Sequence, residues 1–414
     1  MSAPALAVAD DAKKADEKKK WDVEAPFGPT RTVAFTTDEG TWMNLDVSPD
    51  GEEIVFDLLG DIYIMPIAGG EAVLLRGGPA FEVQPRFSPD GKRISYTSDK
   101  DGADNIWIMK RDGSDAKQVT KEDFRLVNNA AWTPDGQYIV CKKHFTSGRS
   151  LGAGEMWLYH ASGGEGLQIT KRRNDQQDVG EPCVSPDGRY VYFSEDMSPG
   201  PYFQYNKDPN GEIYMIRRVD RETGEVKNVI TGPGGAVRPQ ISPDGKRLAY
   251  VHRVRTETVL YVQNLETGAQ HPIFDGLSRD QMETWATFGV YPNYQWTPDG
   301  QAIVIWAKGE FAKVDVAART ATNIPFQVHA SHVVHEALRF RQEVSPPSFE
   351  AKMIRHASTS PDGRWLVFSA VGHIWKKKLP DGAPARITRD TNWEYWPSFS
   401  ADGKWIAYTT WSDD

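Results

Sequence analysis

The sequence predicts an all-β fold, a β-propeller of four-stranded antiparallel blades, with seven complete blades and a partial eighth. Three observations predict it. A Ser/Thr-Pro-Asp-Gly turn recurs along the chain, an alternating hydrophobic strand follows each copy, and two further strands complete most repeats. Radial repetition also explains how 414 residues form one architecture.

The turn is the most regular element of the repeat. Its Ser or Thr hydroxyl bonds the backbone of its own turn, Pro presets φ, Asp accepts the second central position and Gly accepts a positive φ. Such a turn joins two antiparallel strands. The last copy has Ala401 in place of Pro. The eight copies begin at Ser48, Ser88, Thr133, Ser185, Ser242, Thr297, Ser360 and Ser400.

The strands around each turn follow one plan. In the second copy, Phe87 precedes the turn, Ile94 and Tyr96 alternate after it, a third strand contains Ile106 and a fourth ends near Val119. The eighth copy has its first two strands only. We therefore expect the chain to break off inside a blade.

The N-terminal region is predicted to have two parts. Residues 1–26 are polar and rich in Ala and Lys, which is typical of a disordered leader, and residues 27–414 form the propeller. Ala5-Leu6-Ala7 resembles a signal-peptidase site, although no basic and apolar regions precede it, so an exported chain and an ordinary tail both remain open. The strand at 31–37 is expected to complete the final blade or to patch it imperfectly.

Composition excludes some classes of function. A net charge of −9 and a pI near 5.6 argue against nucleic acid or an anionic membrane as the main partner. No apolar run approaches membrane-spanning length. Cys141 and Cys183 allow a disulfide, but two buried thiols are favoured.

The candidate binding residues come from the innermost strands, whose polar positions are predicted to line a wet central channel. The position four places before each turn gives a candidate ring of ligand-contacting residues, and the position two places further out gives its rim. The alternative is that these side chains hold water and bond neighbouring blades. The ring is Asn44, Gln84, Asn129, Glu181, Arg238, Asn293, His356 and Trp396, and the rim is Trp42, Glu82, Tyr291 and Glu394.

Long insertions are predicted to gather on the face opposite the turns. Insertions confined to one face of a repeat protein mark its binding face. The four longest are 144–154, 197–211, 276–292 and 327–357.

Several catalytic and metal motifs occur, but no catalytic residue, metal or cofactor is predicted. Ser150 stands in a Gly-x-Ser-x-Gly sequence but lacks the strand-turn-helix of a hydrolase. His329, His332 and His335, with Glu336 nearby, are too loosely spaced to favour a metal site over an exposed strand or loop.

Two further motifs are also too incomplete to predict a site. Asp99, Asp101, Asp104 and Asn105 resemble part of a calcium loop without its final Glu. No His-x-His pair and no phosphate-binding Gly-rich loop occur.

A family resemblance is carried by the segment Phe87 to Met109, which looks like the TolB/tricorn-type (WD40-like) propeller repeat and covers the chain from about residue 31 to the end. The segments 149–155, 234–239 and 283–286 are more specifically similar to the N-terminal propeller of large exported bacterial amidohydrolases. In those proteins a metal-dependent hydrolase domain follows the blades, and this chain would lack it.

The resemblance implies a non-catalytic propeller for substrate or protein recognition within an exported amidohydrolase-like protein. Its partner would be a peptide, a protein or a downstream hydrolase domain. The alternatives are a free-standing periplasmic interaction scaffold like TolB and, less favoured, the propeller of a prolyl-oligopeptidase-like peptidase. Export to the periplasm is expected from the resemblance, with the cytoplasm left open.

Overall fold

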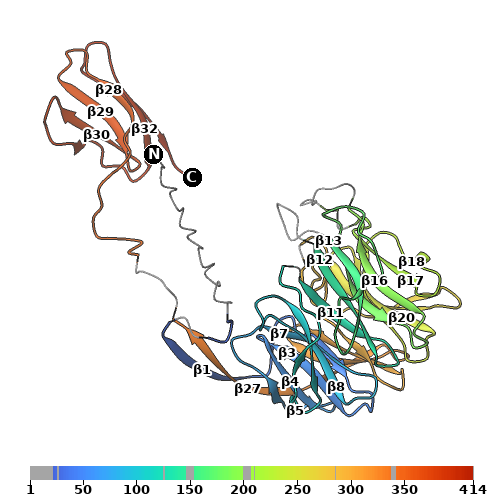
Figure 1. The fold of residues 1–414 in the computed structure, drawn as a ribbon. Coiled ribbons are helices and arrows are strands. Elements are labelled where there is room, and N and C mark those ends of the chain that lie inside the picture. The colour runs from blue at the N-terminus through green and yellow to red at the C-terminus, as the bar shows by residue number, and fades with distance from the viewer. Residues whose placement is uncertain are drawn as a thin grey trace, which may run out of the picture. The chain divides into compact units, whose positions relative to one another are not determined.

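The computed structural model describes residues 22–25, 28–124, 126–145, 153–198, 207–208, 210–284, 286–336 and 342–413. These residues are all-β, as predicted, and most of the strands lie in four-stranded antiparallel sheets (Figure 1). Contacts divide the chain into two compact units, 1–336 and 337–414, and each is described by itself. Among the described residues no helix is long and apolar enough to cross a membrane.

Unit 1 contains six blades, each a four-stranded meander. Blade 1 is β2 (Leu45–Val47), β3 (Glu53–Leu58), β4 (Asp61–Pro66) and β6 (Val73–Arg76). Blade 2 is β7 (Glu82–Phe87), β8 (Arg93–Ser98), β9 (Asn105–Lys110) and β10 (Lys117–Gln118). Blade 3 is β11 (Val127–Trp132), β12 (Tyr138–Phe145), β13 (Ala153–His160) and β14 (Leu167–Gln168).

The next three blades follow the same plan. Blade 4 is β15 (Val179–Val184), β16 (Tyr190–Asp196), β17 (Tyr214–Asp220) and β18 (Val226–Ile230). Blade 5 is β19 (Ala236–Ile241), β20 (Arg247–Val254), β21 (Glu257–Asn264) and β22 (Gln270–Phe274). Blade 6 is β23 (Gln295–Trp296), β24 (Ala302–Ala307), β25 (Glu310–Asp315) and β26 (Thr320–Ile324).

The recurring turn folds as its sequence predicts. In the first copy Ser48 Oγ donates to Asp50 Oδ1 at 2.5 Å and accepts from the backbone N–H of Glu53 at 2.9 Å. The N–H of Gly51 donates to the Ser48 carbonyl at 2.8 Å, and Gly51 has a φ of 75°. The Ser or Thr hydroxyl bonds the turn Asp in all eight copies.

The six blades of unit 1 close into a ring, because blade 6 meets blade 1 as every other blade meets its neighbour. A Cβ on Gly91 would lie 3.5 Å from Pro49 of the preceding turn, and one on Gly51 would lie 3.4 Å from Pro298 of blade 6. The Leu45 N–H also donates to the Asn293 carbonyl at 3.1 Å. The ring therefore closes after six of the eight repeats.

The N-terminal strand does not complete a blade, which corrects that expectation. β1 (Thr30–Thr37) pairs antiparallel with β27 (Phe326–His335) over eight residues, and β27 pairs with β5 (Gly70–Glu71). The three strands form a sheet of their own (Figure 1). Blade 6 already has four strands, so no place in it is left for β1.

Unit 2 holds the last two repeats. One is a complete blade, β28 (Arg355–Thr359), β29 (Trp365–Ala370), β30 (His373–Lys378) and β31 (Ala385–Arg386). The other is the pair β32 (Trp393–Phe399) and β33 (Ile406–Trp411). A Cβ on Gly403 would lie 3.5 Å from Pro361, which repeats the contact between ring blades. The described residues of the two units therefore contain seven complete blades and a partial eighth.

Candidate binding site on the propeller axis

In blades 2 to 5, the ring position four places before the turn lies on a β-bulge that the sequence pattern did not predict. Gln84, Asn129, Glu181 and Arg238 have φ between 53° and 59°, and the pairing register shifts at each of them. A bulge leaves its backbone N–H outside the ladder. The available signal was a proline inside the strand, directly after the bulge in three of these four blades, since Pro in a strand is confined to edges and bulges.

Three of these bulges connect two blades through the backbone N–H. The N–H of Gln84 donates to Asp57 Oδ2 of blade 1 at 2.7 Å, and the N–H of Asn129 donates to Gln84 Oε1 at 2.9 Å. The N–H of Arg238 donates to Glu181 Oε2 at 2.7 Å. These contacts repeat around the axis, so the ring side chains bond neighbouring blades, which is the alternative weighed from the sequence.

Blade 6 joins blade 1 through the same kind of bond. The N–H of Asn293 donates to Asn44 Oδ1 at 2.9 Å, and Asn293 Nδ2 donates to the Leu45 carbonyl at 2.7 Å. The six ring residues of unit 1 are all 1–4 % exposed. They therefore do not line the wet channel that we expected.

The 276–292 insertion closes this end of the axis, and we call its residues 286–291 the plug. Gln84 Nε2 donates to the Phe288 carbonyl at 2.6 Å, and the N–H of Val290 donates to Glu181 Oε1 at 2.6 Å. Arg238 Nε donates to the Tyr291 carbonyl at 2.8 Å. Three candidate ring residues thus bind the chain's own backbone.

The plug is anchored by a buried ionic cluster. Arg253 is 1 % exposed, and its guanidinium is paired with Asp280 and Glu283. Thr258 Oγ1 donates to Asp280 Oδ2 at 2.7 Å. A buried charge is tolerated only with such partners. The cluster holds the base of the insertion against blade 5.

A second contact holds the plug against blade 3. Asn128 Nδ2 lies 3.2 Å from the Thr287 carbonyl, and His144 Nε2 lies 3.2 Å from the same oxygen. Burial lowers the pKa of His144 well below its ordinary value, so its imidazole is neutral at pH 7. With Nε2 protonated, the neutral ring donates to the plug.

The rim residues of unit 1 are mostly used in packing. Tyr291 is fully buried and its hydroxyl donates to the Trp306 carbonyl at 3.0 Å, while half-buried Trp42 packs 5.9 Å from the Tyr291 ring. Glu82 is 1 % exposed and pairs with Arg76 at 3.3 Å. These three residues offer a ligand little surface.

The remaining candidates lie in unit 2, which corrects the expected ring of eight. The rings of His356 and Trp396 lie 4.9 Å apart, and Trp396 is 61 % exposed. Glu394 is fully buried and its Oε2 accepts from the Ile374 N–H at 3.0 Å. Because the ring closes at blade 6, these three residues belong to blades outside the ring.

The opposite end of the axis contains a cavity of about 330 Å³, which we call the funnel. Exposed turn prolines, Pro49, Pro89, Pro186, Pro243 and Pro298, stand around it. Its walls come from the position two places before each turn, Asp46, Arg86, Ala131, Cys183, Gln240 and Gln295. The alternation of side chains along each innermost strand places these residues on the axis. None of them was predicted to bind a ligand.

The funnel has a polar side and an apolar side. On blades 1, 2 and 6, Arg86 Nε lies 3.6 Å from Asp46 Oδ2, and Gln295 Nε2 donates to Asp46 Oδ1 at 2.9 Å. Burial raises the pKa of Asp46, although the charge of Arg86 opposes this. Blades 3 and 4 contribute no charged or amide side chain to the lining, which there consists of Ala131, Trp132, Cys183, Val184 and Pro186. A ligand with one polar and one apolar side fits these walls.

The motifs discounted from the sequence gain no support. His329 and His332 point to different sides of β27, toward Thr36 and Asp61. Among the described residues no group of three or more His, Cys, Asp or Glu could hold a metal ion. Both cysteines are free and buried. Ser150 lies outside the described residues.

Four-stranded blades arranged in a closed ring, with the plug at one end of the axis, define a β-propeller. Comparison with known proteins shows which propellers it resembles. Residues 30–203 match the TolB beta propeller domain family. The described residues thus have a β-propeller fold, and the matched segment is similar to the TolB propeller family. A TolB crystal structure from Acinetobacter baumannii superposes with a TM-score of 0.52 at 16 % identity, covering 71 % of this chain and 66 % of that one, which supports the fold alone.

Two curated relatives are similar in sequence. The uncharacterized peptidase YuxL of Bacillus subtilis is 27 % identical over 46 % of this chain and 24 % of its own length. The Tol-Pal system protein TolB of Helicobacter hepaticus is 28 % identical over 37 % of this chain and 37 % of its own length. The alignments thus span well under half of either relative.

Proposed function

We propose that this propeller is a non-catalytic recognition module that binds a peptide or protein segment in the funnel. One observation carries the proposal. The plug closes the axis at one end. At the other end the funnel, with its polar side and its apolar side, opens between exposed prolines. This differs from the insertion-bearing face that we favoured from the sequence.

The kind of ligand follows from the walls. The polar groups of an extended segment would lie against Arg86, Gln240 and Gln295, and a small side chain fits against Ala131 and Cys183. The residues four places before the turn would contact a ligand only if the plug left the axis.

The parent protein is proposed from the sequence resemblance. We favour the propeller of an exported, amidohydrolase-like hydrolase, in which the funnel selects or docks substrate. Similarity to TolB supports a free-standing periplasmic scaffold as the second candidate. Similarity to a protein named as a peptidase supports a third candidate, the propeller of a prolyl-oligopeptidase-like enzyme.

The test uses Cys183 as a reporter. Peptides selected from a random display library for binding to the chain are expected to slow modification of Cys183 by methyl methanethiosulfonate. Cys141 is fully buried and serves as the internal control, since it should react only after denaturation. Binding peptides that leave the rate at Cys183 unchanged would place recognition elsewhere and overturn the funnel.

A second measurement tests the absence of catalysis. The purified chain is expected to hydrolyse no amide, ester or peptide substrate. Turnover that disappears in Ser150→Ala, with the circular dichroism spectrum unchanged, would contradict a purely recognitive role.

A further inference from the structure

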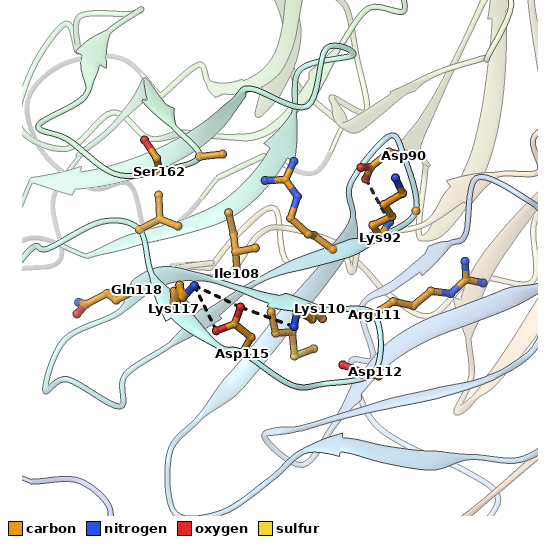
Figure 2. A pocket seen from close by; sticks show the side chains of 15 residues that line it. Asp90, Lys92, Ile108, Lys110, Arg111, Asp112, Asp115, Lys117, Gln118 and Ser162 are labelled. Atoms are coloured by element: carbon orange, nitrogen blue, oxygen red, sulfur yellow. Dashed lines mark hydrogen bonds and ion pairs between the residues drawn. The ribbon is translucent and has the colours of Figure 1, made fainter.

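A second groove lies away from the axis, at the outer seam between blades 2 and 3. Its cavity measures about 990 Å³, and Ile108, Met109 and Val119 form its apolar floor. Figure 2 shows charged side chains from the turn at Asp90 and from the 110–117 region around this floor. The space is large enough for several residues of an extended peptide.

The groove continues along the seam. A neighbouring cavity of about 680 Å³ shares Gln118, Val119 and Ser162 with it and extends over Trp157 and Tyr159. The two cavities together form one trough, which runs beside β10, the outermost strand of blade 2.

The charge of the groove is opposite to that of the chain. Five cationic and three anionic residues line the larger cavity, whereas the whole chain has a net charge of −9. The cations are Lys92, Arg93, Lys110, Arg111 and Lys117, and the anions are Asp90, Asp112 and Asp115. An excess of cations on an acidic protein indicates a local site for an anionic partner.

Some of these cations are already neutralised. Arg111 pairs with Asp50 and Glu53 at 2.7 Å each, and Asp115 lies 3.2 Å from Lys117 and 4.0 Å from Lys110. Neither Lys92, which is exposed, nor Arg93 has a carboxylate partner in the part of the chain that the structure describes. Asp90 lies near enough for both charges to lower its pKa, but one carboxylate balances only one of the two cations.

The trough also contains an unused hydrogen-bond donor. Nε2 of Gln118 is buried and has no partner among the described residues, although Gln118 lines both cavities. An unpaired buried amide costs about 1–3 kcal/mol, so a ligand carbonyl that accepts from it would be favoured. This donor is independent of the charge.

We propose that the trough binds an extended acidic peptide segment of a partner protein. Its carboxylates would face Lys92 and Arg93, its apolar side chains would lie on Ile108 and Val119, and a backbone carbonyl would accept from Gln118. This surface is separate from the funnel and does not depend on what the funnel binds.

Blade 5 provides a matched control. Lys246 and Arg247 occupy the repeat positions of Lys92 and Arg93, and Arg247 donates to the Gly300 carbonyl at 2.8 Å as Arg93 donates to that of Gly136 at 3.0 Å. Lys246→Glu therefore makes the same change in charge at the same kind of turn, away from the trough.

The experiment measures fluorescence anisotropy of a labelled decapeptide of alternating Glu and Leu against the full chain. Lys92→Glu is expected to weaken binding about fivefold, since one exposed charge at the trough is reversed. Lys246→Glu should change it less than about twofold, because it lies away from the trough. Ser162→Trp, which fills the junction of the two cavities without changing charge, should also weaken it.

Three results would overturn the proposal. The first is equal binding of the Lys-Leu counterpart peptide, and the second is an equal loss with Lys246→Glu. The third is displacement by heparin together with full binding by Ser162→Trp, which would indicate a non-specific polyanion surface. Thermal melts of each variant confirm that a loss of binding is not a loss of fold.

Discussion

The buried carboxylate of Asp57 shows how single residues hold adjacent blades together. It accepts from the backbone N–H of Gln84 in blade 2 at 2.7 Å and from the N–H and side chain of Asn44, both at 2.8 Å. These bonds favour the charged form, yet burial outweighs them and raises the pKa of Asp57 to about 6. The connection between blades 1 and 2 therefore depends on pH.

Asp57→Asn tests this dependence. The folded pKa of about 6 exceeds the unfolded value of about 3.9, so the folded state binds the proton more tightly. Between about pH 4 and pH 6 the wild type should lose stability relative to Asp57→Asn as pH rises, by up to about 3 kcal/mol. Urea unfolding of both proteins across this range measures it. A wild type that gains on the variant with rising pH would show that the pKa is lowered.

At the scale of an element, the plug decides which end of the axis is open. It has no regular secondary structure, and its position comes from backbone contacts with Gln84, Glu181 and Arg238. Gly289 permits the approach, with φ at 110° and no room for a side chain, since a Cβ would lie 2.1 Å from Arg238 Nη2.

Gly289→Ala should therefore displace the plug. We expect a loss of about 2–4 kcal/mol in unfolding free energy and faster hydrogen exchange at residues 286–291. Gly164→Ala is the matched control. Gly164 has φ at 123°, but a Cβ added to it would meet nothing within 4 Å. This substitution therefore measures the cost of backbone strain without the cost of a steric clash. Equal effects of the two substitutions would mean that the plug does not depend on this contact.

At the scale of the whole molecule, the ring is closed by blade-to-blade contacts and not by the N-terminal strand. β1 is largely exposed, and among the described strands it pairs with β27 alone. Asn293, by contrast, is 2 % exposed, bonds blade 1 directly and accepts from Gln240 Nε2 at 2.7 Å.

Removing residues 1–37 should accordingly lower the melting temperature of the ring by less than about 5 °C. Asn293→Ala should cost about 2–4 kcal/mol, because Gln240 and Arg86 lose their acceptor in a buried site. Asn323→Ala, at an exposed position of β26, is the control for the substitution. Circular dichroism melts compare the three. A larger loss from the truncation than from Asn293→Ala would restore β1 as the closing element.

The repeat could be predicted from the amino-acid sequence alone, because the turn chemistry and the alternation of hydrophobic residues are local. Ser48, Pro49, Asp50 and Gly51 bond within one turn, so eight copies indicate eight modules wherever these lie. The proline after Gln84 was also visible, but its meaning as a bulge depends on the neighbouring strand.

The size of the ring and the open end of its axis, by contrast, follow from the packing of the blades. Closure after six blades brings Gly51 beside Pro298, two residues far apart in sequence. The path of the plug likewise depends on Arg253 and on ring residues from other blades. Such contacts between distant residues leave no periodic pattern in the chain, whereas a turn carries its own chemistry in four consecutive residues.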